Sequence, residues 1–192
     1  MRIGVLASQG AFAEHIAALN QLEVDAVPVR LPGELAQLDG LIIPGGESTS
    51  ICRLMRDYDL LAEVRNLAKG GLPVLGTCAG MVLLANDALD ARIEPLGVMD
   101  MKVRRNAFGR QRESFETELV IPVLGERPFP GVFIRAPVIE QANGSVEVLA
   151  KLADGRGVAA RQGKLLACAF HPELTDDLRF HQYFLGIVIG QQ

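Results

Sequence analysis

Tryptophan is absent from this 192-residue chain, and aromatic residues make up only 5% of it. Positive charge is not in excess either, because 19 lysine and arginine residues stand against 23 aspartate and glutamate residues, for a net charge of −4. Nucleic-acid recognition needs a basic surface, and single-strand binding also needs aromatic rings for stacking. We therefore expect no nucleic-acid partner.

Long apolar runs and paired cysteines are missing as well. No stretch approaches the roughly 20 apolar residues that span a membrane, and the opening run 1–7 is too short for the core of a signal peptide. Cys52, Cys78 and Cys168 form no C-x-x-C pair and are odd in number, which suits a reducing compartment. The sequence thus predicts a cytoplasmic protein without membrane contact, metal site or cofactor.

The composition, 49% apolar and 22% charged, is that of one globular domain over residues 1–192, without repeats or a linker. Apolar strand-like runs alternate with helical periodicity in the first half. Strands are expected over 1–7, 24–29, 40–43 and 73–77, with helices ending near 22 and covering 48–68. This βαβ order predicts a three-layer α/β fold, in which helices flank a mostly parallel central sheet and the site lies at the carboxyl ends of the strands.

The second half is richer in strands. A helix is expected to close the fold from about Asp176, and 122–130 is expected to be a loop. Strands are predicted over 96–104, 115–121, 132–135 and 146–152, followed by a hairpin over 157–170 that turns at Gln162-Gly163.

A cysteine flanked by small residues, Gly76-Thr77-Cys78-Ala79-Gly80, follows one apolar run and precedes another. The two glycines leave room for a strained strand-to-helix elbow that exposes a nucleophile. At the start of a helix, the dipole and the free backbone N–H groups favour thiolate over thiol. Many cysteines are inert core residues, so the elbow alone leaves both interpretations of Cys78 open.

A histidine and a glutamate stand together at the end of another apolar run, in His171-Pro172-Glu173. Their spacing lets one carboxylate orient one imidazole, which is the arrangement of a catalytic triad. The alternative is that His171 only ends the strand and Glu173 only begins a helix after Pro172.

A glycine turn, Pro44-Gly45-Gly46-Glu47-Ser48, follows the strand 40–43. In a cysteine acyl-transfer enzyme such a turn supplies one oxyanion donor, here the N–H of Gly46, and the residue after the nucleophile, Ala79, supplies the other. An ordinary helix cap by Ser48 or Thr49 is the alternative, and the two are compatible.

Together these three motifs resemble those of the class I, or triad, glutamine amidotransferases, whose fold is flavodoxin-like. Within that family, further stretches resemble the glutaminase subunit of pyridoxal 5'-phosphate synthase, and the resemblance covers essentially the whole chain. These stretches are 4–10 with Glu14 and His15, Arg105-Asn106-Ala107-Phe108-Gly109-Arg110-Gln111 with 114–116, and Phe133-Ile134-Arg135-Ala136-Pro137.

The resemblance implies hydrolysis of L-glutamine to L-glutamate and ammonia, with Cys78 as nucleophile, His171 as base and acid, and Glu173 orienting the imidazole. It also implies that the ammonia passes to a separate synthase subunit, which builds the ring of pyridoxal 5'-phosphate (vitamin B6). The glutamine site that it implies consists of Gly46, Glu47, Ser48, Arg105, Ile134 and Arg135.

The charged members of that site suit the ends of a free amino acid. Arg105 and Arg135 are candidate cations for the α-carboxylate, and Glu47 is a candidate acceptor for the α-ammonium. Each arginine could instead be a solvated surface charge. His15 and His181 are expected to be packing or polar-contact residues rather than catalysts.

Two other functions remain open at this point. One is a triad amidotransferase that supplies a nucleotide, histidine or anthranilate pathway, against which the stretches 105–111 and 133–137 argue. The other is a non-catalytic or redox-sensing relative with an oxidisable elbow cysteine, which would not need His171-Pro172-Glu173.

Overall fold

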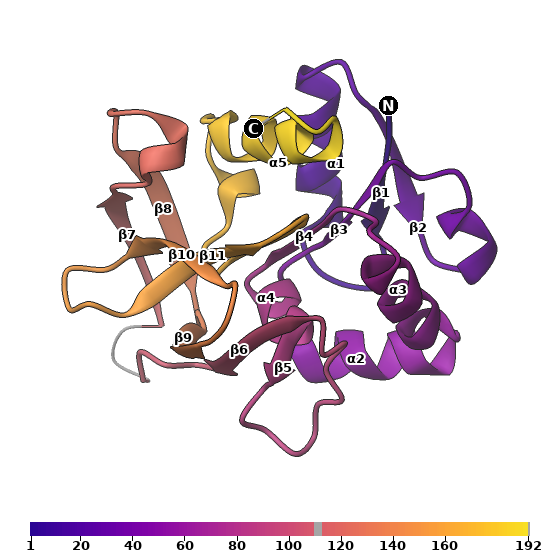
Figure 1. Cartoon of the computed structure of the whole chain (residues 1–192), viewed down its shortest axis with the longest axis horizontal. Coiled ribbons are helices and arrows are strands. Elements are labelled where there is room, and N and C mark those ends of the chain that lie inside the picture. The colour runs from indigo at the N-terminus through magenta and orange to yellow at the C-terminus, as the bar shows by residue number, and fades with distance from the viewer. Residues whose placement is uncertain (110–112, 192) are drawn as a thin grey trace.

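The computed structural model describes residues 1–109 and 113–191, and it is built around one mixed ten-stranded sheet (Figure 1). Arg110 and Gln111 of the stretch 105–111 lie outside the described residues. Along the sheet the order is β2-β1-β3-β4-β12-β11-β9-β6-β5, and β10 pairs with β11. The strands are β1 (Arg2–Leu6), β2 (Asp25–Val29), β3 (Gly40–Ile43), β4 (Val74–Thr77), β5 (Ala85–Asp87), β6 (Met99–Arg104), β9 (Val138–Ala142), β10 (Glu147–Lys151), β11 (Gly157–Gln162) and β12 (Leu165–Cys168).

The half of the sheet from β2 to β12 is parallel throughout. Its central strands are fully buried, as their continuous apolar runs require when helices cover both faces. From β12 to β6 the neighbouring strands pair antiparallel, and the edge strand β5 pairs in parallel with β6. The predicted α/β fold with added strands in the C-terminal half is confirmed.

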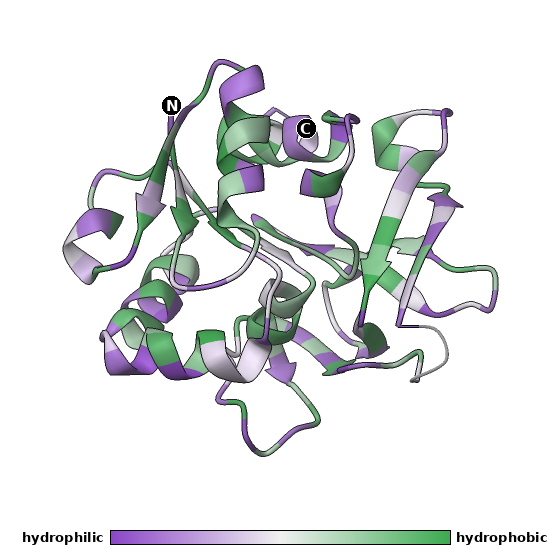
Figure 2. Ribbon diagram, turned by 180° about the vertical axis from the view of Figure 1, so that it is seen from behind, coloured by the Kyte–Doolittle hydropathy of each residue, from purple (hydrophilic) through white to green (hydrophobic). Residues whose placement is uncertain are grey.

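Helices lie on both faces of the parallel half (Figure 1). α1 and α5 share one face, and α2, α3 and α4 lie on the other, with the apolar strands between them (Figure 2). Among the described residues, no helix has the length and apolar character needed to cross a membrane. The helices are α1 (Phe12–Gln21), α2 (Ser48–Asp57), α3 (Leu60–Lys69), α4 (Ala79–Leu84) and α5 (Arg179–Val188).

The helix expected over 48–68 is instead two helices, so that prediction was wrong. The helix is interrupted between α2 and α3, where Asp59 adopts a left-handed conformation with φ of 59°. Aspartate tolerates this conformation better than most residues. The turn lets Met55 of α2 and Val64 of α3 both reach the core, where each is fully buried.

The C-terminal half departs from the expectations at two strands. β9 was not predicted, and β8 (Phe129–Ile134) begins inside the expected loop 122–130. Pro130 is tolerated there because, within the described ranges, β8 pairs with β7 (Ser114–Leu119) alone, in a separate two-stranded sheet. The hairpin over 157–170 is confirmed, with Gly163 in a left-handed conformation at its turn.

Candidate active site

Cys78 stands on a strained turn between β4 and α4. Its φ of 48° and ψ of −101° are unusual for a side chain other than glycine, and the residue is buried. The flanking glycines make the turn possible, because a Cβ atom on Gly80 would lie 2.1 Å from the carbonyl oxygen of Ile43, and one on Gly76 would lie 2.6 Å from the backbone of Gly80. The predicted elbow is therefore present.

Strand pairing brings the histidine motif to the same edge of the sheet as the elbow. β12 pairs in parallel with β4, with Cys168 opposite Thr77, and the N–H of Cys78 donates to the carbonyl oxygen of Cys168 at 2.7 Å. The chain beyond β12 then reaches His171, whose N–H donates to the carbonyl oxygen of Val132 on β8 at 2.8 Å. Two segments that are distant in sequence thus meet at the carboxyl ends of neighbouring strands.

His171 and Glu173 form a buried pair. Nδ1 of His171 lies 2.7 Å from Oε1 of Glu173, and the two side chains are 8% and 0% exposed. Burial opposes the charge on His171, but hydrogen bonds with Cys78 and Glu173 outweigh it and raise the pKa of His171 to about 10. Burial would raise the pKa of Glu173, but His15 and His171 hold that pKa below its usual range. The geometry suits a charged imidazole held by a carboxylate.

Gly45 lies where the imidazole and the thiol converge. A Cβ atom at this position would lie 2.3 Å from Cε1 of His171 and 3.2 Å from Cβ of Cys78. Only a residue without a side chain lets the imidazole approach the elbow this closely. The glycine turn is thus in contact with both reactive side chains.

The N-terminal loop braces that glycine turn. The N–H of Ala11 donates to the carbonyl oxygen of Gly45 at 3.2 Å, and the N–H of Glu47 donates to Oε1 of Gln9 at 3.0 Å. Both peptide groups beside Gly46 are therefore held by residues that precede α1. Gln9 was not predicted as a site residue, although it lies in the stretch 4–10 that carries the family resemblance.

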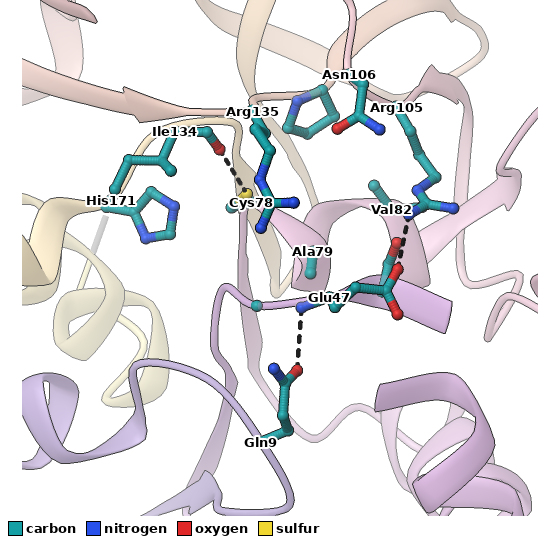
Figure 3. A pocket seen from close by; sticks show the side chains of 13 residues that line it. Gln9, Glu47, Cys78, Ala79, Val82, Arg105, Asn106, Ile134, Arg135 and His171 are labelled. Atoms are coloured by element: carbon teal, nitrogen blue, oxygen red, sulfur yellow. Dashed lines mark hydrogen bonds and ion pairs between the residues drawn. The ribbon is translucent and has the colours of Figure 1, made fainter. Parts of the chain in front are cut away.

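A cavity of about 210 Å³ opens beside Cys78 (Figure 3). It is small and its walls combine polar and apolar groups, as a site for a single amino acid requires. All the predicted site residues except Glu173 line it, and Glu173 lies behind His171. The predicted residues that line it are Gly46, Glu47, Ser48, Cys78, Ala79, Arg105, Ile134, Arg135 and His171, and Gln9, Val82, Asn106 and Pro137 complete the wall.

Glu47 caps α2 and also binds Arg105. Its carboxylate accepts hydrogen bonds from the N–H groups of Thr49 and Ser50 and lies 2.8 Å from Nη2 of Arg105. Burial would raise the pKa of Glu47, but the hydrogen bonds from Thr49 and Ser50 lower it to about 2. The cap expected from Ser48 or Thr49 is provided by Glu47 instead, because its longer side chain reaches back to both N–H groups.

Arg105 is held from its other side by Asp90, which the sequence did not point to. Nη1 of Arg105 lies 2.7 Å from Oδ2 of Asp90, and the arginine side chain is only 15% exposed. Asp90 also binds Arg92, and hydrogen bonds from Arg92 and then Arg105 depress the pKa of Asp90. A short acidic residue in an irregular loop gives no signal of its own, so only the fold identifies this contact.

Arg135 has a different environment from Arg105. It is exposed, adopts a left-handed conformation with φ of 43°, and has no ion pair with a carboxylate of the described residues. Its neighbour Ile134 offers a carbonyl oxygen 3.8 Å from Sγ of Cys78. The loop after β8 therefore places next to the thiol a cation that pairs with no carboxylate in the described part of the chain.

A family model described as the SNO glutamine amidotransferase family matches residues 5–189. The chain belongs to this family. Curated relatives named pyridoxal 5'-phosphate synthase subunit PdxT also match this chain over nearly its full length. The one from Herpetosiphon aurantiacus is 58% identical over 190 residues, covering 97% of this chain and 100% of the relative. The one from Moorella thermoacetica is 59% identical over 188 residues, covering 98% and 100%.

Two solved structures share the fold of this chain, and one of them is also similar in sequence. A crystal structure of a glutamine amidotransferase matches with a TM-score of 0.90 at 49% identity, covering 97% of this chain and 98% of that chain. PurLQS from Thermotoga maritima has a TM-score of 0.69 at 15% identity, covering 96% and 97%, and shares the fold. The resemblance found from the motifs is confirmed.

Proposed function

We propose that this chain hydrolyses L-glutamine to L-glutamate and ammonia and delivers the ammonia to the ring-building subunit of pyridoxal 5'-phosphate synthase. The observation that carries the proposal is the convergence of the Cys78 elbow, the His171–Glu173 pair and the glycine turn on one small cavity. The partner follows from the relatives named subunits of that synthase, which match this chain from end to end.

The reaction uses the three triad residues in turn. The thiolate of Cys78 attacks the side-chain amide carbon of glutamine, and the negative oxygen that forms is stabilised by the N–H groups of Gly46 and Ala79. His171 gives its proton to the departing nitrogen, so ammonia leaves and a glutamyl thioester remains. His171 then takes a proton from water, whose oxygen attacks the thioester and releases glutamate and the thiolate. Glu173 orients the imidazole in every step and stabilises its charged form whenever His171 carries the extra proton.

Recognition of the free amino acid is assigned to the charged residues that line the cavity. Arg135, which has no carboxylate partner among the described residues, binds the α-carboxylate. Arg105 is already balanced by Glu47 and Asp90, so it fixes the shape of the wall and keeps Glu47 in place near the α-ammonium. The N–H groups of the glycine turn and Ser48 complete the polar lining.

The test is glutamate release from L-glutamine by the purified chain, wild type and Cys78→Ala, each with and without the ring-building synthase subunit. We expect release that requires Cys78 and rises when the synthase is added. Activity indifferent to the synthase would point to another amidotransferase pathway. Absence of activity under every condition, together with oxidation of Cys78 that glutamine does not protect against, would favour a redox sensor.

A further inference from the structure

Two histidines lie behind the triad, on the face of the sheet covered by α1 and α5. His15 of α1 and His181 of α5 are both fully buried, and Nδ1 of His15 lies 3.0 Å from Nε2 of His181. The other ring nitrogen of His15, Nε2, lies 3.1 Å from Oγ1 of Thr77 and 3.3 Å from Oε2 of Glu173. One imidazole therefore contacts the last residue of β4, the triad carboxylate and the final helix.

The contacts of His15 select one arrangement of its protons. Nε2 of His15 is hydrogen-bonded to the Thr77 hydroxyl and also faces the ionised Oε2 of Glu173, which would repel a ring lone pair, so we place the hydrogen of the neutral ring on Nε2. Burial lowers the pKa of His15, so the ring is neutral and Nδ1 is an acceptor. Nδ1 then receives the N–H of His181 Nε2, and burial likewise lowers the pKa of His181, to about 3. The N–H of His181 thus points at His15, and the N–H of His15 points toward Thr77 and Glu173.

This contact falls on the oxygen of Glu173 that the triad leaves unused. Oε1 of Glu173 binds His171, whereas Oε2 is buried and accepts no hydrogen bond from any described group; Nε2 of His15 lies 3.3 Å from it. A buried carboxylate oxygen without a donor costs free energy and allows the carboxyl group to rotate or to take up a proton. An N–H dipole on Nε2 of His15, 3.3 Å from this oxygen, opposes both changes electrostatically.

We propose that His15 is a positioning residue of the glutaminase reaction: through Nε2–H it fixes the carboxylate of Glu173 and keeps it ionised, so that Glu173 can orient His171. His181 acts one step further out, because its N–H selects the required tautomer of His15. This inference rests on the proposed hydrolysis of glutamine by Cys78. It adds two residues to the machinery that were expected only to pack or to make polar contacts.

The pH dependence follows from the groups around Glu173. Without the donor from His15 the carboxylate is protonated at higher pH, and the acidic limb of kcat/KM moves upward. Among the described residues, no arginine or lysine acts on His15, Glu173 or His181 in a way that would mask the change. The titratable groups that interact with Glu173 or His15 are His171, Cys168, His181 and Glu14, and Cys78 acts on this set through His171 and Cys168.

A matched pair of amide substitutions tests the donor itself. Glutamine can place an N–H near the position of Nε2 of the imidazole, whereas the shorter asparagine reaches only the position of Nδ1. With the synthase subunit present, His15→Asn is expected to lower kcat about tenfold to a hundredfold, the range for losing one hydrogen bond to a charged group, with little change in KM. Its acidic limb should move to higher pH. His15→Gln should recover most of kcat and the wild-type pH profile.

A packing control separates this role from simple loosening of α1. Leu19 lies one turn beyond His15 on the same helix and is fully buried. Leu19→Ala should lower the melting temperature while leaving kcat and the pH profile unchanged. If either amide variant fails to fold, His181→Phe replaces it, and a several-fold fall in kcat with the same upward shift of the acidic limb is expected.

A second measurement does not depend on glutamine or on the synthase. The rate of Cys78 alkylation by iodoacetamide, followed by mass spectrometry of the peptide across pH, reports the state of the thiol and imidazole pair directly. In His15→Asn its acidic limb should shift upward, and in His15→Gln it should overlay the wild type. Identical alkylation profiles and identical kcat for the two amide variants would overturn the inference. Normal alkylation shifts with no glutaminase activity would instead overturn only the proposed function.

Discussion

The guanidinium of Arg105 lies 2.8 Å from the carboxylate of Glu47, the residue that caps α2 beside the glycine turn. The two cationic residues of the cavity are therefore unequal, because Arg105 is paired on both sides while Arg135 has no carboxylate partner among the described residues. This difference predicts which of them binds the charged end of the substrate.

Replacing Arg135 with alanine should raise KM for glutamine by about tenfold or more and change kcat much less. The reason is that a charge-assisted hydrogen bond to the α-carboxylate is lost equally from the ground state and the transition state. Steady-state kinetics with the synthase subunit measures both constants. Arg104→Ala is the control, because Arg104 is 60% exposed and pairs with Glu140 outside the cavity. An unchanged KM in Arg135→Ala would contradict the assignment.

Substitution of Asp90 by asparagine should loosen Arg105 without removing it. We expect KM to rise by about threefold to tenfold, because Asp90 acts on the substrate only through Arg105 and Glu47. The same kinetic assay measures the effect. Asp25→Asn serves as its partner variant, since Asp25 forms an exposed pair with Arg2 at 3.7 Å, far from the cavity in the fold. Equal kinetics for the two variants would show that the Asp90 contact is not needed.

A methyl group added at Gly45 should reduce kcat by about a hundredfold or more, since it would displace the imidazole of His171 by a large fraction of an ångström or more. Circular dichroism and melting curves would check that Gly45→Ala still folds. Gly33→Ala provides the comparison, because a Cβ atom there would meet nothing within 4 Å and φ is not in the left-handed region. Wild-type activity in Gly45→Ala would mean that His171 does not need this position during the reaction.

The carboxylate of Glu47 should make stability depend on pH. Because its pKa of about 2 in the folded chain lies below the ordinary value of 4.5, its stabilising contribution is complete above about pH 4.5 and is lost as pH falls toward 2. Glu47→Gln should therefore lower the melting temperature at pH 7 by about 2–4 °C, and the difference from wild type should shrink below pH 4.5.

Thermal melts across pH measure this directly. Glu63→Gln on the exposed face of α3 should show no such pH-dependent difference. A difference that stays constant from pH 7 to pH 2.5 would mean that the charge of Glu47 contributes nothing to the cap.

The sequence predicted those parts of the fold in which local pattern and tertiary structure agree. The buried strands, the Cys78 elbow and the hairpin at Gly163 carry signals in apolar runs and glycines. The interruption at Asp59 has no such signal, because the helical periodicity continues across it. The strand β9 has none either, because it is short and its apolar and polar residues do not alternate clearly. Only packing decides such elements.

The candidate site divides in the same way. The residues of the three motifs were found from spacing and family resemblance, and the structure gathers them around one cavity or directly behind it. Asp90 was not predicted, and His181 was expected only to pack or to make a polar contact of unknown partner, because their contacts come from segments that are separate in sequence and meet only in three dimensions. A lone aspartate or histidine in a chain carries no information about such a partner.

The position of β12 has a consequence for the making of the protein. This strand is synthesised last, yet it lies in the middle of the sheet between β4 and β11. A chain still on the ribosome thus holds β4 and its cysteine with an open strand edge, which is prone to wrong pairing, until the C-terminal segment arrives. Chains that end before residue 171 lack both His171 and Glu173, so they have no complete triad with which to release ammonia. The triad is therefore complete only after the segment that follows β12 has been synthesised and has folded.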